Sequence, residues 1–172
     1  MILPRAARMR VDRVRARPIV EHAPRRRQLD GKLVAVLDDD ASAIDAMHAL
    51  FATLRADVAG ATGPDELLDD LGRFGRYPDL VVADLRLARG MTGVDAIARL
   101  RDELGEPVPA LIVTGDTSPA AAQLVREAGL PMLAKPVDPT ALEDAACELM
   151  SAAVPGPRAM APRLATQTGL AG

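Results

Sequence analysis

The sequence predicts an α/β domain built on a parallel sheet. Apolar runs of four or five residues recur between positions 33 and 134, and between them apolar residues recur every three or four positions. The short runs are typical of strands, and the longer spacing is typical of helices with one apolar face. Five such strands alternating with five helices favour right-handed crossovers that place helices on both faces of the sheet.

The composition supports one folded unit with few aromatic residues. The chain has 172 residues, of which 49% are hydrophobic but only 2% aromatic, so Ala, Val, Leu and Ile must form the core. Residues 1–30 hold nine Arg against three acidic residues, whereas residues 31–150 hold 10 basic and 21 acidic residues. A globular segment this acidic does not resemble a nucleic-acid-binding domain.

Three segments are expected along the chain. Residues 1–30 predict a basic, largely disordered segment that we interpret as a solvated linker, residues 31–150 the folded domain, and residues 151–172 a disordered tail. Cys147 is the only cysteine, which excludes a disulfide within the chain and a multi-cysteine metal site. No apolar run approaches 18 residues, so we expect no membrane span, and the cytoplasm is the expected location.

The strands are predicted from apolar runs that end abruptly on polar or charged residues. Runs without polar alternation are typical of strands buried on both faces of a parallel sheet. The second run is the weakest of the five. In chain order the expected strands are Leu33–Leu37, Asp57–Ala61, Leu80–Asp84, Ala110–Val113 and Leu130–Ala134.

The first two helices are predicted from capping signals and apolar spacing. Ser42 and Asp45 are spaced for a capping box, which predicts a helix from about Ser42 to Arg55. Thr62 as N-cap and Pro64 in the first turn predict the start of the second helix. The residues expected to face inward are Ile44, Met47, Phe51 and Leu54 in the first helix and Leu67, Leu71 and Phe74 in the second.

The remaining helices follow the third, fourth and fifth strands. The apolar stripe over Val94–Leu104 predicts the third helix. Ser-Pro at residues 118–119 provides an N-cap and first turn for the fourth, which Gly129 ends. Asp-Pro at residues 138–139 repeats the capping signal for the last helix.

Polar residues follow four of the five expected strands. Asp38 and Asp39 follow the first, Asp84 ends the third, Thr114 follows the fourth and Lys135 follows the fifth. The carboxyl ends of parallel strands meet at one edge, where such sheets bind their ligands. Each residue alone could be a helix cap or a solvated side chain. Two carboxylates about 4 Å apart repel by roughly 4 kcal/mol at an effective dielectric near 20, so three together call for a cation.

The chemistry of this predicted cluster suits phosphoryl transfer. Lys135 supplies one positive charge, and an oxygen-only site without His or Cys suits Mg²⁺ better than Zn²⁺. Phosphoryl transfer needs in-line positioning and neutralisation of the phosphoryl oxygens. The ion, Lys135 and the Thr114 hydroxyl could provide both, with an aspartate as the nucleophile.

The motifs resemble those of two-component receiver domains, as in response regulators. Leu33–Asp40, Leu80–Asp84, Thr114-Gly115 and Lys135-Pro136 fall in the order that these domains have, over about residues 32–150. Asp-Leu-Arg-Leu from residue 84, Val-Thr-Gly-Asp from residue 113 and Gly-Leu-Pro from residue 129 resemble the C-terminal receivers of hybrid histidine kinases. The resemblance implies a flavodoxin-like fold with strand order 2-1-3-4-5.

The resemblance also implies a role for each residue at the strand ends. Asp84 matches the phosphoacceptor and a metal ligand, and Asp38 and Asp39 match the Mg²⁺ pair. Arg86 would offer its backbone carbonyl to the ion. Thr114 matches the switch hydroxyl.

Lys135 matches the phosphate-contacting lysine, and its bond to Pro136 is expected to be cis. The sequence departs from the usual pattern at Met132, where many receivers carry a Tyr or Phe. The implied partners are a histidine kinase or phosphotransfer protein and a second copy bound through the face formed by the fourth helix and fifth strand. The implied role is a phosphoacceptor in signalling, with at most self-catalysed phosphotransfer and autodephosphorylation.

Other readings of the same residues remain open. Asp38 and Asp40 fit the nucleophile and acid/base of a haloacid-dehalogenase-type phosphatase, with Thr114 and Lys135 as later motifs. That reading leaves Asp84 without a role and lacks a further acidic strand after the lysine. A degenerate receiver that serves only as an interaction module is another alternative, and nucleic-acid binding through the basic N-terminal segment is a third.

Overall fold

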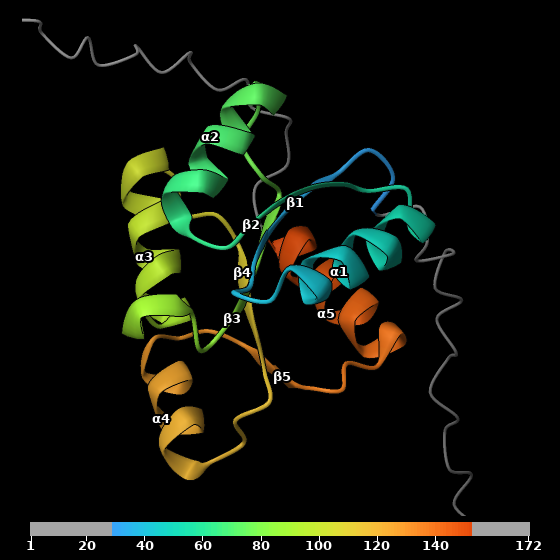
Figure 1. Ribbon diagram of the computed structural model, residues 1–172. Helices are drawn as coiled ribbons and strands as arrows, with labels where there is room; N and C mark the ends of the chain where they lie inside the picture. Colours follow the sequence, from blue (N-terminus) through green and yellow to red (C-terminus); the bar gives the residue numbers. More distant parts are fainter. Residues whose placement is uncertain (1–28, 153–172) are drawn as a thin grey trace, which may run out of the picture.

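Five parallel strands form the sheet at the centre of the computed structural model, which describes residues 29–152 (Figure 1). The strand order is β2-β1-β3-β4-β5, which confirms the flavodoxin-like topology expected from the sequence. The predicted basic N-terminal segment lies outside the described residues except for its last two positions, and the predicted C-terminal tail lies outside them after residue 152. The strands are β1 (Leu33–Leu37), β2 (Asp57–Ala61), β3 (Leu80–Asp84), β4 (Ala110–Thr114) and β5 (Met132–Ala134).

Within residues 29–152, four α-helices and one short 3-10 helix connect the strands, and a fifth α-helix follows β5. α1 and α5 lie on one side of the sheet, and α2 and α3 lie on the other (Figure 1). None of the helices within residues 29–152 combines the length and the apolar character that a membrane crossing requires. The helices are α1 (Ala41–Thr53), α2 (Pro64–Phe74), η2 (Ala88–Gly90), α3 (Gly93–Leu104), α4 (Pro119–Glu127) and α5 (Pro139–Ala152).

The sheet separates two apolar layers because successive strand residues point to opposite faces. In β1, Leu33, Ala35 and Leu37 belong to the layer under α2, α3 and α4. Val34 and Val36 belong to the layer under α1 and α5. Every residue of β1 is buried, as its unbroken apolar run predicts for a strand covered on both faces.

The strand register aligns the carboxyl ends of β1, β3, β4 and β5. Leu37 of β1 is opposite Ala83 of β3, so the residues that follow each lie side by side. Asp84 is opposite Val113 of β4, one residue before Thr114. The same edge therefore receives the polar residues that end these strands.

The beginnings of α1 and α2 correct two sequence predictions. Asp40, not Ser42, is the N-cap of α1, and its side chain accepts a hydrogen bond from the Ser42 backbone N–H. The predicted capping box of Ser42 and Asp45 is wrong because α1 begins directly after the acidic run. The N-cap of α2 is Gly63 rather than Thr62, since a residue before proline is held extended and Pro64 occupies the first helical position.

Two other cap predictions are confirmed and one cap was missed. The Ser118 side chain caps α4, and the Asp138 carboxylate accepts a hydrogen bond from the Ala141 backbone N–H at 2.8 Å. α3 begins with a capping box, absent from the sequence prediction, in which Thr92 and Asp95 bond to each other's backbone. Thr92 directly before Gly93, with Asp95 three residues later, is a recognisable sequence signal for this capping box.

The ends of two elements also differ from prediction. Phe74 does not face inward but is 40% exposed, because it is the last residue of α2 before the left-handed Gly75. β5 begins at Met132 rather than Leu130, because the Leu130 backbone N–H bonds to the Val125 carbonyl and closes the end of α4.

Candidate functional site

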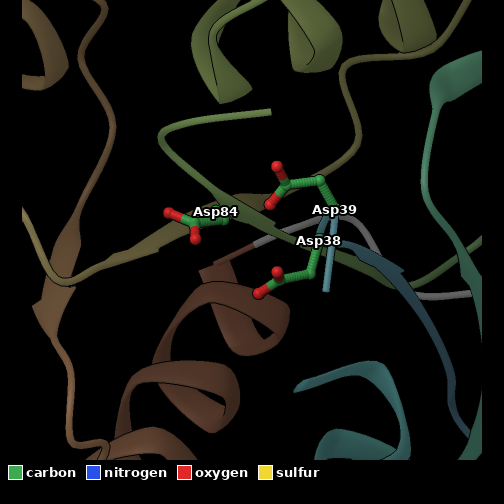
Figure 2. A group of neighbouring side chains, drawn as sticks. All are labelled: Asp38, Asp39 and Asp84. Atoms are coloured by element: carbon green, nitrogen blue, oxygen red, sulfur yellow. The ribbon is translucent and has the colours of Figure 1, made fainter. Parts of the chain in front are cut away.

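Three carboxylates meet at the carboxyl edge of the sheet. Oxygen atoms of Asp38, Asp39 and Asp84 lie within 4.8 Å of one another. Figure 2 shows the three side chains directed to the same side, two from the end of β1 and one from the end of β3. Asp38 is 5% exposed, Asp84 is half-buried and Asp39 is open to solvent. The arrangement is a small acidic cluster with one accessible member.

Lys135 bridges two of the three carboxylates. Its Nζ donates to Oδ2 of Asp38 and to Oδ2 of Asp84, each at 2.8 Å. Burial alone would lower the pKa of Lys135, but the two hydrogen bonds and the charges of Asp38 and Asp84 outweigh burial and raise that pKa above its ordinary value. Lys135 therefore stays charged at neutral pH and offsets part of the repulsion within the cluster.

The backbone of β5 delivers Lys135 to this position. Its N–H donates to the Thr114 carbonyl at 2.8 Å, which continues the β4–β5 ladder beyond the last strand residue. The Lys135–Pro136 bond is cis, as expected from the sequence. Met132, three residues earlier, is half-buried and packs against the apolar layer on the α3 side of the sheet.

The remaining carboxylate oxygens differ in how they are held. Oδ1 of Asp38 accepts from the Asp40 backbone N–H at 3.0 Å, and Oδ1 of Asp84 accepts from the Arg86 backbone N–H at 3.3 Å. The Asp39 carboxylate makes no hydrogen bond or ion pair within residues 29–152. Asp39 is thus the carboxylate that is most open to a ligand.

Asp40 follows Asp39 in the sequence but caps α1 instead of joining the acidic cluster. Its Oδ1 accepts from the backbone N–H and the hydroxyl of Ser42, at 2.9 and 2.6 Å, at the start of α1. These bonds, with that of the Ser42 hydroxyl first, hold the pKa of Asp40 below its ordinary value. A general acid needs a carboxyl that keeps its proton, so this environment opposes the role that the phosphatase reading gives Asp40.

Thr114 is fully buried at the end of β4. Its hydroxyl oxygen accepts a hydrogen bond from the Asp116 backbone N–H at 3.1 Å. In the described part of the chain no hydrogen bond joins this hydroxyl to Asp84. The hydroxyl is therefore near the acidic edge but engaged with its own loop.

The loop after Asp84 forms a small hairpin. Arg86 and Thr92 form an isolated antiparallel bridge, and η2 makes the turn between them. The Arg86 guanidinium extends to the next loop and pairs with the Asp116 carboxylate. Sequence reasoning considered only the backbone of Arg86. The available signal was a pair of opposite charges, each two residues past the end of a neighbouring strand.

Gly93 is a second residue that sequence reasoning did not place at the site. A Cβ atom built at this position would lie 2.1 Å from the Asp84 carbonyl oxygen. The Gly93 backbone N–H donates to the Leu85 carbonyl at 2.9 Å. Only glycine allows α3 to begin this close to the backbone of Asp84.

The fold, the acidic edge and a family comparison together assign the chain to a class of signalling domain. An open parallel sheet binds ligands beyond the carboxyl ends of its strands, and here that edge carries the acidic cluster and Lys135. The family model of the response regulator receiver domain matches residues 34–146, and the chain belongs to this family of two-component signalling proteins.

Solved structures of receiver domains share this fold. A response regulator receiver protein from Pseudomonas putida is 28% identical, with a TM-score of 0.60 over 69% of this chain and 97% of that one. A CheY-like receiver domain protein from Methanospirillum hungatei JF-1 is 21% identical, with a TM-score of 0.61 over 72% and 96%. The signal receiver domain of an HD domain-containing protein from Pseudomonas fluorescens Pf-5 is 21% identical, with a TM-score of 0.60 over 71% and 96%. Among curated proteins, none matches the sequence.

Proposed function

We propose that Asp84 accepts a phosphoryl group from a histidine kinase or a phosphotransfer protein, in a reaction that requires Mg²⁺. The observation that carries the proposal is the contact of Lys135 with both Asp84 and Asp38, beside the accessible carboxylate of Asp39. This arrangement combines a nucleophile, a fixed positive charge and oxygen donors for a cation within one strand edge.

The proposed step is a displacement at phosphorus. A carboxylate oxygen of Asp84 attacks the phosphorus of a phosphohistidine, so an O–P bond forms while the P–N bond breaks. The leaving imidazole nitrogen keeps the bonding electron pair and takes up a proton. The Lys135 ammonium, 2.8 Å from Oδ2 of Asp84, is placed to stabilise the charge on the transferred group. Attack by water at the same phosphorus would return the carboxylate and release inorganic phosphate.

The acidic cluster fits a divalent cation. Within residues 29–152 the three carboxylates lie beside one ammonium group, which pairs with two of them, so a surplus of negative charge is left at the edge. Oxygen-only donors suit Mg²⁺, and we assign Asp38, Asp39 and Asp84 as ligands, with the backbone carbonyl of Arg86 as a further one. When bound, the ion supplies positive charge to the phosphoryl oxygens.

Thr114 would couple phosphorylation of Asp84 to a change in conformation. A phosphoryl group adds a charge of roughly −1.5 to −2 and new hydrogen-bond acceptors, taking phosphoserine as a guide. The Thr114 hydroxyl would donate to one of these acceptors, which requires its loop to move toward Asp84. That loop leads into α4, so the change reaches the α4–β5 face. Leu124 on this face is 39% exposed, and we propose this surface as the contact with a second copy.

The proposal makes this chain a phosphoacceptor rather than an enzyme with a separate substrate. Its partners are the phosphoryl donor and whatever protein reads the modified surface, and we place it in the cytoplasm, where two-component phosphotransfer occurs. A chain that receives no phosphoryl group would instead be an interaction module of the same fold.

Incubation with acetyl phosphate and MgCl₂, followed by a phosphate-affinity gel, tests the proposal. The wild-type protein should shift, and Asp84→Asn should not. Asp69→Asn is the charge-matched control, because Asp69 is exposed on α2 and belongs to no ion pair among the described residues. No shift in the wild type, or an equal shift in Asp84→Asn, would contradict the assignment.

A further inference from the structure

An ion pair joins the two loops that flank the candidate phosphoacceptor. Arg86 Nη2 lies 2.5 Å from Asp116 Oδ2, although the two residues are 30 positions apart. Arg86 is two residues beyond Asp84 at the end of β3, and Asp116 is two residues beyond Thr114 at the end of β4. The pair therefore ties the loop of the acceptor to the loop of the buried hydroxyl.

Asp116 is fixed from two further directions. Its Oδ1 accepts from the Ser118 backbone N–H at 3.0 Å, and Ser118 is the N-cap of α4. Its own backbone N–H donates to Thr114 Oγ1 at 3.1 Å. One residue thus contacts the switch hydroxyl through its backbone, the start of α4 through Oδ1 and the other loop through Oδ2.

This network holds Thr114 in the arrangement in which its hydroxyl oxygen is engaged with Asp116. The hydroxyl makes no hydrogen bond to Asp84 in this conformation, so we take its contact with a phosphoryl group on Asp84 to require movement of the loop that carries Asp116. An interaction made in only one of two conformations shifts the equilibrium toward that conformation by the free energy of the interaction. A contact that anchors this loop to Arg86 in the present conformation therefore opposes the movement.

We propose that the Arg86–Asp116 ion pair is a latch: in the unphosphorylated protein it restrains the loop that follows Thr114 and carries Asp116. Arg86 and Asp116 are positioning residues that act through Thr114. The inference rests on the proposed function, because the latch matters only if a phosphoryl group binds at Asp84. It also offers this chain a way to couple the acceptor to α4 with Met132, rather than an aromatic residue, on β5.

The test measures equilibrium binding of beryllofluoride, a phosphoryl analogue, in the presence of Mg²⁺ by titration calorimetry. The variants are Arg86→Gln, Asp116→Asn and the double variant. Each variant retains the backbone carbonyl of residue 86 that is proposed as a metal ligand. Asn at position 116 retains a side-chain oxygen that can accept a hydrogen bond from the Ser118 backbone N–H. Arg99→Gln is the matched control, since it removes an arginine from a surface ion pair with Asp65, between α2 and α3.

A latch predicts that all three variants bind the analogue more tightly and to the same extent. The gain should be about two- to fivefold, the scale of a surface ion pair, because Arg86 is 78% exposed. The Thr114 amide resonance of each free variant should also move toward its position in the bound wild type. Arg99→Gln should bind as the wild type does.

Other outcomes overturn the latch. A purely electrostatic role predicts weaker binding for Arg86→Gln, tighter binding for Asp116→Asn and near wild-type binding for the double variant. Equal affinity in all proteins means that the ion pair does not restrain the loop. Absence of binding in the wild type and in every variant contradicts the proposed function itself, and the latch with it. These results are distinguishable from one another.

Discussion

Lys135 Nζ lies 2.8 Å from Oδ2 of Asp84, although the two residues are 51 positions apart. The same ammonium group lies 2.8 Å from Oδ2 of Asp38, which is buried at the end of β1. The strand order places β3 between β1 and β4, so a side chain from β5 must reach across β4 to make both contacts. The length of lysine and the parallel alignment of the strand ends make this bridge geometrically feasible.

Replacing Lys135 by methionine should slow phosphorylation by acetyl phosphate about a hundredfold, because one charged donor to the transferred group is lost. The free energy of unfolding should fall by roughly 1–2 kcal/mol, since two buried or half-buried carboxylates lose their partner but part of the effect is screened by solvent. Lys32→Met is the control, because Lys32 Nζ pairs with Asp79 at 2.9 Å and is equally exposed at 30%. A similar loss of rate in both variants would argue against a specific role for Lys135.

Asp39→Asn should stabilise the protein in the absence of Mg²⁺. Its carboxylate lies within 4.8 Å of two others and has no partner of its own within residues 29–152, so its removal relieves repulsion worth roughly 1 kcal/mol. Urea unfolding with and without MgCl₂ measures the effect. Mg²⁺ should stabilise the wild type, as any ligand of the folded state does, and should stabilise the variant much less. Equal stabilisation of both proteins would remove Asp39 from the proposed ligands.

Gly93→Ala should disturb the backbone of Asp84. The added Cβ would lie 2.1 Å from the Asp84 carbonyl oxygen, so α3 or the end of β3 must shift, at a cost of about 1–3 kcal/mol in the free energy of unfolding. The rate of phosphorylation should fall as well. In Gly63→Ala the Cβ has open space, so the only cost is that alanine is a poorer N-cap than glycine, about 0.5–1 kcal/mol, and the rate of phosphorylation should not change. Equal stability of the two variants would show that the close approach is not needed.

The ion pair of Asp116 should weaken in acid. A hydrogen bond from the Ser118 backbone, with further bonds from Ser118 and Arg86, lowers the pKa of Asp116 from 3.8 to about 2. Because the folded protein binds the proton more weakly than the unfolded chain, this contribution to stability is complete above pH 3.8 and is lost as the pH falls toward 2. The difference in free energy of unfolding between wild type and Asp116→Asn should therefore shrink over this range. A difference that grows as the pH falls would contradict the lowered pKa.

Sequence patterns predicted the strand ends because burial on both faces leaves a strong signal. Leu33–Leu37 and Leu80–Asp84 are bounded by polar residues, and their predicted limits agree with the structure. Parallel alignment then brings the residues that follow them together. Burial is weaker at the periphery, where Phe74 was expected to face inward but lies exposed at the end of its helix.

Contacts that depend on loop geometry were beyond sequence reasoning. The choice between Asp40 and Ser42 as N-cap depends on how the chain leaves β1. The two positions are less than one helical turn apart. The Arg86–Asp116 pair and the close approach of Gly93 to Asp84 depend on how two loops fold over the same edge. The matching positions of Arg86 and Asp116 after their strands are visible in the sequence, but the path of the two loops is not, so these contacts were found only in the structure.

Chemical trapping of the modified residue identifies the phosphoacceptor directly. The wild-type protein is incubated with acetyl phosphate and MgCl₂, reduced with borohydride and digested, and mass spectrometry then identifies any aspartyl phosphate as homoserine. Homoserine should form at position 84 and at no other aspartate, and none should form when the metal is chelated. Homoserine at position 38 or 39 with Asp84 unmodified would contradict the assignment of Asp84 as the phosphoacceptor.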